Sequence, residues 1–200
     1  MKIAISAAET SGDLIASSLV KSLKAISPKY EIDGLAGNKM IEAGCKSLWH
    51  TDEINVMGIS EVVKKLPQVL GVRKSIIRYY SLNKPDVFIG VDSPDFNFKI
   101  EKKLRRLGIK TIHLVSPSVW AWRAKRIKKI KESTDLILCL FPFEVDFYRK
   151  HNQKALFIGH PLAEKLSPRK NYKANKEVLL MPGSRAVSYT HLTLPTSVTV

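Results

Sequence analysis

Short apolar blocks alternate along the chain with longer segments in which apolar residues recur at helical spacing. The blocks at 2–7, 30–35, 87–91, 110–115, 135–140 and 155–158 are typical of strands, and the continuous block 87–91 is typical of a strand buried on both faces of a parallel sheet. From Leu14 onward the apolar positions repeat every three or four residues, which predicts a helix after the first strand. This alternation predicts an α/β fold with helices on both faces of a parallel sheet.

Two carboxylates follow the strand at 87–91. In open α/β sheets ligands bind just beyond the carboxyl ends of the strands, and a carboxylate that ends an apolar strand loses hydration. We therefore predict a functional role for Asp92, as a general base. Asp95 follows Ser93 and Pro94, and we interpret it as the N-cap of a helix over 96–107.

A second candidate site is the loop A-E-T-S-G-D at 8–13, between the first strand and the first helix. Free backbone N–H groups at a helix N-terminus favour an anionic group, and Gly12 would let that group approach. Glu9 and Asp13 would repel a phosphate, so an ordinary capped turn is the alternative.

The loop after strand 110–115 reads S-P-S-V-W-A-W-R. Trp120 and Trp122 offer flat apolar surface, and Arg123 offers a fork for phosphate or carboxylate. The alternative is that both rings only pack the loop onto the domain. The run 123–131 that begins at this arginine has six basic residues in nine, which is typical of a peripheral membrane contact or a nucleic-acid patch.

Composition narrows the class of protein. The 200 residues are 44% hydrophobic and carry a formal net charge of +15, which predicts attraction to nucleic acid, anionic lipid or phosphorylated substrates. Cys45 and Cys139 form no spacing motif for a metal or a disulfide framework, so we expect both to be reduced and structural. We expect no cofactor. With no signal peptide and no apolar run of transmembrane length, we expect a cytoplasmic protein.

We predict four regions along the chain. Residues 1–161 form the first domain, the lysine-rich stretch 162–176 is a linker, and 177–185 begins a second βα unit. Residues 186–200 contain no Lys, Arg, Asp or Glu, although 26% of the chain is charged. Our hypothesis is that this last segment is foreign sequence, since it resembles the translation of a sequencing adapter.

Taken together, these motifs resemble the lipid-A-disaccharide synthase family. The resemblance rests on A-E-T-S-G-D at 8–13, V-M-G-I at 56–59, K-P-D-V-F-I-G-V-D-S-P-D-F-N at 84–97, K-T-I-H-L-V-S-P-S-V-W-A-W-R at 110–123, F-I-G-H-P at 157–161 and P-G-S-R at 182–185. It implies the N-terminal, Rossmann-like half of an inverting glycosyltransferase with two Rossmann domains (the GT-B type). The implied partners are UDP-2,3-diacylglucosamine, 2,3-diacylglucosamine 1-phosphate and an anionic membrane surface, and not nucleic acid. The implied location is the cytoplasmic face of the inner membrane of a Gram-negative bacterium, and no metal is implied.

The resemblance also implies roles for single residues. Asp92 would take the proton of the acceptor 6-hydroxyl, and Arg185 would lie near the leaving diphosphate. The residues implied to bind substrate elsewhere are Glu9, Ser11, Gly12, Asp13, Asn97, Trp120 and Arg123, with Asn97 and Arg123 orienting phosphate or sugar hydroxyls. Because the family's second domain is missing after Arg185, we expect no transferase activity from this chain alone. The alternatives are another two-Rossmann UDP-N-acetylglucosamine enzyme and a basic fragment that binds membrane or nucleic acid.

Overall fold

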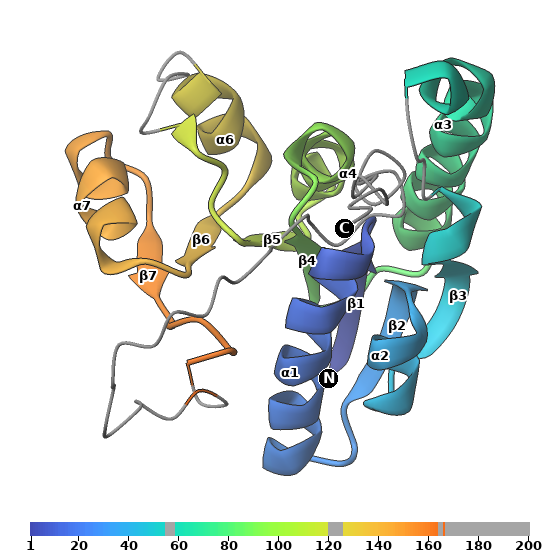
Figure 1. The fold of residues 1–200 in the computed structure, drawn as a ribbon, viewed down its shortest axis with the longest axis horizontal. Helices are drawn as coiled ribbons and strands as arrows, with labels where there is room; N and C mark the ends of the chain where they lie inside the picture. Colours follow the sequence, from blue (N-terminus) through green and yellow to red (C-terminus); the bar gives the residue numbers. More distant parts are fainter. Residues whose placement is uncertain (55–58, 120–125, 164–165, 167–200) are drawn as a thin grey trace, which may run out of the picture. The chain divides into compact units, whose positions relative to one another are not determined.

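The described part of the chain forms one parallel sheet of seven strands in the order β3-β2-β1-β4-β5-β6-β7 (Figure 1). The structure is a computed structural model, and the description covers residues 1–54, 59–119, 126–163 and 166, with no side chains described for 59–64. All of these residues belong to a single unit, Met1–Leu166. This strand order, with every pairing parallel, is that of a Rossmann fold, as predicted from the sequence.

The strands and helices alternate through the whole unit. The strands are β1 Lys2–Ala7, β2 Glu31–Ala36, β3 Lys46–His50, β4 Val87–Val91, β5 Lys110–Leu114, β6 Leu136–Cys139 and β7 Ala155–Phe157. The helices are α1 Thr10–Ile26, α2 Asn38–Glu42, α3 Ile59–Leu82, α4 Pro94–Arg106, α6 Ile127–Ser133 and α7 Pro142–Lys150, with a 3-10 turn η1 at Thr51–Glu53. The edge strand β3 was not predicted, because its residues are only half-buried and show no apolar block.

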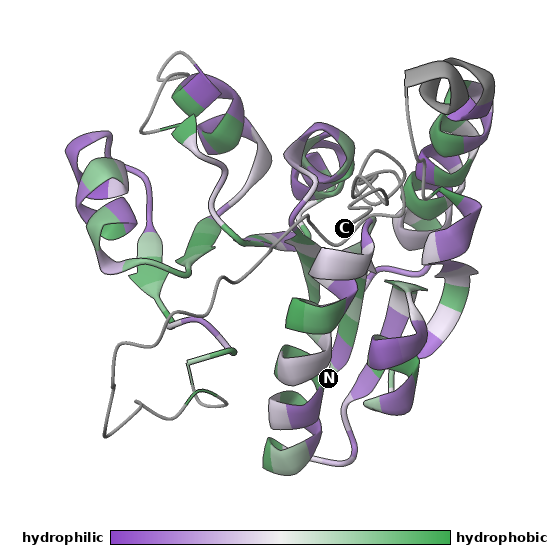
Figure 2. Cartoon of the chain, in the orientation of Figure 1, coloured by the Kyte–Doolittle hydropathy of each residue, from purple (hydrophilic) through white to green (hydrophobic). Residues whose placement is uncertain are grey.

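Apolar clusters cover both faces of the sheet. Ile3 and Ile5 of β1 pack on one face with residues of α1 and α2, such as Val20. On the other face Phe88 packs with residues of α3 and α4, such as Ile100. In Figure 2 the helices α1, α4, α6 and α7 each carry both hydrophobic and hydrophilic residues, as expected for helices with one side on a sheet. The predicted arrangement of helices on both faces is confirmed.

A buried ionisable pair lies between α4 and the sheet. The side chains of Glu101 and His113 are fully buried, with 2.7 Å between Oε1 and Nδ1. Gly90 of β4 makes room for them, because a Cβ at this position would overlap Glu101 Oε1 and lie 2.9 Å from the Cβ of Asn97. Burial raises the pKa of Glu101, and the neighbouring histidine partly counteracts that rise. The burial of this pair therefore requires glycine at position 90 of β4.

Replacing Gly90 by alanine should destabilise the protein by about 2 kcal/mol, because the added Cβ would overlap the fully buried Glu101 and crowd the Cβ of Asn97. The matched control is Gly71→Ala, at an exposed position of α3 where a Cβ would meet nothing within 4 Å. That change should stabilise the chain by about 0.5–1 kcal/mol through helix propensity. Urea unfolding of the two variants measures both effects, and an equal shift in both would contradict the packing argument.

Candidate active site

The candidate site lies where the order of the strands reverses. From β1 the chain continues to β2 and β3 on one side, whereas from β4 it continues to β5, β6 and β7 on the other. The helices that follow these two neighbouring strands pack on opposite faces, α1 on one and α4 on the other. The loops after β1 and β4 therefore diverge, and ligands of such folds bind beyond the strand ends at this point.

Asp92 follows β4 directly at this switch point. Its backbone has a positive φ of 53°, and Ser93 after it has a φ of 42°. The peptide N–H of Asp92 donates to the carbonyl of Leu114 at 2.9 Å, and its carbonyl accepts from the amide of Asn97, also at 2.9 Å. Left-handed conformations cost about 1–3 kcal/mol at residues other than glycine, and they cluster at functional sites. Both hydrogen bonds hold Asp92 in this turn.

Two hydrogen bonds connect the loop after β1 with the loop after β4. Ser11 Oγ donates to Asp92 Oδ2 at 3.3 Å, and Ser93 Oγ donates to Glu9 Oε1 at 2.8 Å. In the described part of the chain, Oδ1 of Asp92 accepts no hydrogen bond. The structure thus brings together three of the predicted site residues, and leaves one oxygen of the carboxylate without a protein donor.

Gly12 acts at the same place through its small size. It lies in the first turn of α1, and a Cβ on it would be 3.3 Å from the carbonyl oxygen of Val91 and 3.6 Å from the Cβ of Asp92. The missing side chain therefore lets the first turn of α1 lie against the end of β4. The sequence predicted that Gly12 allows a ligand to approach, and the structure shows that it allows the helix to approach.

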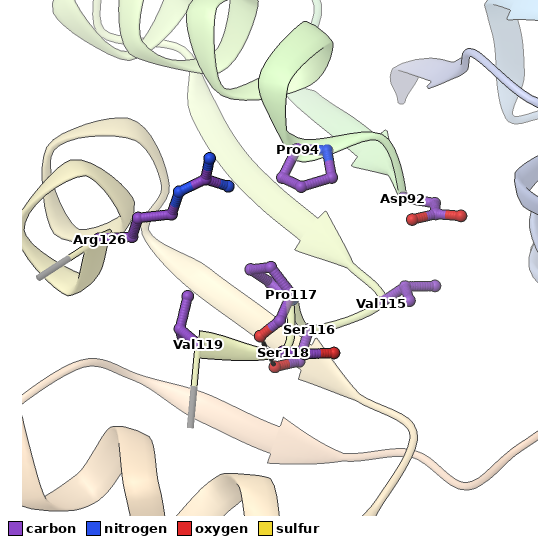
Figure 3. A pocket seen from close by; sticks show the side chains of 8 residues that line it. All are labelled: Asp92, Pro94, Val115, Ser116, Pro117, Ser118, Val119 and Arg126. Atoms are coloured by element: carbon purple, nitrogen blue, oxygen red, sulfur yellow. Dashed lines mark hydrogen bonds between the residues drawn. The ribbon is translucent and has the colours of Figure 1, made fainter. Parts of the chain in front are cut away.

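A cavity of about 290 Å³ opens beside Asp92 (Figure 3). This volume is at the lower end of the range for small-molecule sites. Its walls come from the ends of β4 and β5, the start of α4 and the start of α6, and are formed by Asp92, Pro94, Val115, Ser116, Pro117, Ser118, Val119 and Arg126. Val115 has a φ of 76°, which is rare for a β-branched residue, so backbone strain occurs at both strand ends that border the cavity.

Asn97 is buried and is not among the residues that line this cavity. Its side chain is fully buried, and its Nδ2 donates to the carbonyls of Ser6, Val91 and Asp92 at 2.9–3.3 Å. Its Oδ1 accepts from Ser6 Oγ at 2.8 Å. The expectation that Asn97 orients phosphate or sugar hydroxyls is therefore corrected: this amide positions the ends of β1 and β4.

Asp13 also has a structural position. Only 3% of this residue is exposed, and its carboxylate accepts from the backbone N–H groups of Gly37, Lys39 and Met40 at 2.9–3.1 Å. Three donors from the start of α2 converge on one carboxylate, which stabilises that helix terminus. The expectation that Asp13 shapes the acceptor site is corrected, because its carboxylate faces α2 and does not line the cavity.

Asp95 is not the N-cap of α4. The helix begins at Pro94, with Ser93 as its N-cap residue, and Asp95 lies in the first turn. Its carboxylate is 71% exposed and lies 3.7 Å from Nη2 of Arg126 and 3.5 Å from Nζ of Lys129. Arg126 lines the cavity but was interpreted from the sequence only as part of a basic run. Arg126 reaches the cavity because α6 packs next to α4. No local sequence pattern predicts this packing.

Three predicted residues, Trp120, Arg123 and Arg185, lie outside the described residues, and so do the segments 167–176, 177–185 and 186–200. Within the described ranges, no group of three His, Cys, Asp or Glu side chains has an arrangement that could hold a metal ion. None of the helices in those ranges has both the length and the apolar character needed to cross a membrane.

Two solved structures have a fold similar to that of this chain. The glycotransferase of kitacinnamycin matches with a TM-score of 0.54 at 16% identity, over 90% of this chain and 55% of its own. MurG of Acinetobacter baumannii matches with a TM-score of 0.50 at 15% identity, over 84% of this chain and 46% of its own. At these identities the likeness shows the fold, which is the GT-B type of Rossmann domain.

Sequence comparison identifies the family. The model of the lipid-A-disaccharide synthetase family matches residues 3–196, so the chain belongs to this family. Lipid-A-disaccharide synthase of Francisella philomiragia is 47% identical over 96% of this chain and 54% of its own length. Those of Aliivibrio salmonicida and Pseudoalteromonas translucida are 47% and 46% identical over 92% and 94% of this chain. The chain spans about half the length of these relatives, and the family match extends into the segment 186–200.

Replacing Asp13 by alanine should lower the free energy of unfolding by about 2–4 kcal/mol, because three backbone donors lose a charged acceptor. Asp13→Asn should have an intermediate effect, since its NH₂ group would oppose one of these donors. The control Ser11→Ala, which removes one long hydrogen bond at an exposed position, should cost less than about 1 kcal/mol. Urea unfolding of the chain measures all three variants, and an Asp13→Ala protein of normal stability would show that the cap is dispensable.

Proposed function

We propose that this chain supplies the acceptor half of an inverting glycosyltransferase of lipid A biosynthesis. The complete enzyme would join UDP-2,3-diacylglucosamine to the 6-hydroxyl of 2,3-diacylglucosamine 1-phosphate, releasing UDP and the lipid A disaccharide 1-phosphate. The names of the relatives and the family match support the reaction class. The observation that carries the proposal is Asp92, a carboxylate that lines a cavity at the switch point of the sheet.

Inversion at the anomeric carbon requires the acceptor hydroxyl to attack from the face opposite the leaving UDP. The hydroxyl must lose its proton as the new bond forms, so a base has to lie within hydrogen-bond reach of it. In this proposal the free Oδ1 of Asp92 accepts that proton, while Ser11 Oγ holds the other oxygen and so fixes the carboxylate plane. Glu9 and Ser93 connect the two loops that carry these groups.

The acceptor and donor are lipids, so the enzyme has to reach a membrane surface. We place it peripherally on the inner face of the inner membrane, as the resemblance implies. The formal net charge of +15 and the lysines of α6 support this, because basic surfaces are attracted to anionic lipid headgroups by about 1 kcal/mol per residue near the surface.

The nucleotide part of the site belongs to our proposal as well. Arg185 would contact the leaving diphosphate, and Trp120 and Arg123 would contact substrate near the cavity. Residues 177–185 would begin the domain that holds UDP, after a linker at 162–176. Because the relatives are about twice as long as this chain, we expect the 200 residues alone to release no UDP from the nucleotide sugar.

Replacing Asp92 by asparagine should reduce kcat by about a hundredfold to ten-thousandfold, because the amide accepts no proton while its shape is retained. The test uses a full-length synthase that carries residues 1–161 as its N-terminal domain and measures UDP release. The matched control is Asp86→Asn, since Asp86 precedes the same strand at its opposite end, where its carboxylate accepts a hydrogen bond from the N–H of Lys2. Turnover within about threefold of the parent in Asp92→Asn would remove this residue from the mechanism.

A further inference from the structure

The cavity beside Asp92 has opposite charges on its two sides. Figure 3 shows the Asp92 carboxylate on one side and the Arg126 guanidinium on the other, with the rings of Pro94 and Pro117 and the side chains of Val115 and Val119 between or below them. The carboxylate comes from the end of β4, and the arginine is the residue just before α6. A ligand that spans the cavity therefore meets an acceptor of protons at one end and a fixed positive charge at the other.

The guanidinium of Arg126 is only weakly engaged by the protein. Its one ion-pair contact in the described part of the chain is with Asp95 at 3.7 Å, which is longer than a hydrogen bond. Asp95 is 71% exposed and also faces Lys129, so water and a second cation share its charge. An arginine has five N–H donors in a planar fork, which suits a bidentate anion such as phosphate, and no acceptor among the described residues takes a hydrogen bond from this one.

The cavity walls favour one orientation of a phosphorylated sugar. The Ser116 hydroxyl already forms hydrogen bonds with the Tyr148 hydroxyl, at 2.9 Å, and with the carbonyl of Pro117. It therefore adds little to anion binding. Near Asp92 a phosphate would be repelled by the carboxylate, and Ser118 on the cavity wall offers it only a neutral hydroxyl, whereas Arg126 offers a charged guanidinium. The anionic end of a ligand is therefore directed to Arg126.

We propose that Arg126 binds the 1-phosphate of the acceptor sugar and makes the site specific for phosphorylated acceptors. This inference rests on the proposed function, in which the 6-hydroxyl of that sugar lies at Asp92. In an α-hexose 1-phosphate, C1 and C5 both adjoin the ring oxygen, and the phosphate and the C6 hydroxymethyl group lie on opposite faces of the ring. The two groups can therefore point to different sides of the cavity, where Asp92 and Arg126 lie. One bound orientation then satisfies the base and the guanidinium together.

The experiment compares two acceptors and two proteins. Isothermal titration of the 200-residue chain with micellar 2,3-diacylglucosamine 1-phosphate and with its dephosphorylated form gives two dissociation constants. For the parent chain, removal of the phosphate should weaken binding by about tenfold to a hundredfold, as for loss of a charge-assisted hydrogen bond. For Arg126→Met, the two acceptors should bind within about threefold of each other, and the dephosphorylated acceptor should bind as it does to the parent.

Lys129→Met is the matched control, because it removes the same charge beside the same Asp95 from a residue that does not line the cavity. This variant should keep the parent's preference for the phosphorylated acceptor. Titration with UDP separates the two sources of phosphate, and Arg126→Met should leave any UDP binding unchanged.

Two results overturn the inference and separate it from the proposed function. If the parent chain binds both acceptors equally well, or if Arg126→Met keeps the parent's preference, the phosphate is not held by Arg126, while the acceptor role of the chain stands. If the parent chain binds neither acceptor, the proposed acceptor role fails together with the inference. A loss of preference in Lys129→Met equal to that in Arg126→Met would reduce the effect to net charge and also contradict the proposal.

Discussion

The buried amide of Asn97 forms hydrogen bonds to both β1 and β4, at the point where the order of the strands reverses. Its hydrogen bonds reach Ser6 near the end of β1, and Val91 and Asp92 at the end of β4. Loss of this amide would remove four hydrogen bonds, each worth about 0.5–1.5 kcal/mol. The same bonds offset the cost of the left-handed turn that follows β4. The orientation of the Asp92 carboxylate therefore depends on a buried side chain that does not line the cavity.

The electrostatic character of the site follows from this geometry. Asp92 directly follows β4, and α4 starts two residues later. The carboxylate therefore lies at one border of the cavity, and the first turn of α4 lies at another. The exposed Asp95 in that turn holds Arg126 and Lys129 loosely and so keeps two cations near the mouth of the cavity without burying their charge. A negative group that enters the cavity replaces a weak, hydrated ion pair and not a strong one.

The sequence was sufficient for those features that local pattern determines. Apolar blocks located β1, β2, β4, β5, β6 and β7, and the strand-end position singled out Asp92, which does line a cavity at the switch point. The edge strand β3 was missed because half-buried strands lack an apolar block. The predictions for Asp13 and Asn97 were wrong for a different reason. Polar residues near a predicted site suggest ligand contacts, and only the tertiary structure shows that both side chains form hydrogen bonds to backbone groups.

Arg126 could not be found by local reasoning, since the cavity it lines joins residues from four elements. The wall of the cavity formed by Pro94 depends on how α4 is rotated about its own axis. Asn97 and Glu101 lie four residues apart on α4, so both face the sheet, and both occupy the space above Gly90. Hydrogen bonds are directional whereas apolar packing is not, so Asn97 to the strand ends and Glu101 to His113 fix one rotation of this helix. That rotation sets where Pro94, at the start of α4, borders the cavity. The polar contacts between α4 and the sheet thus determine the position of one wall of the cavity.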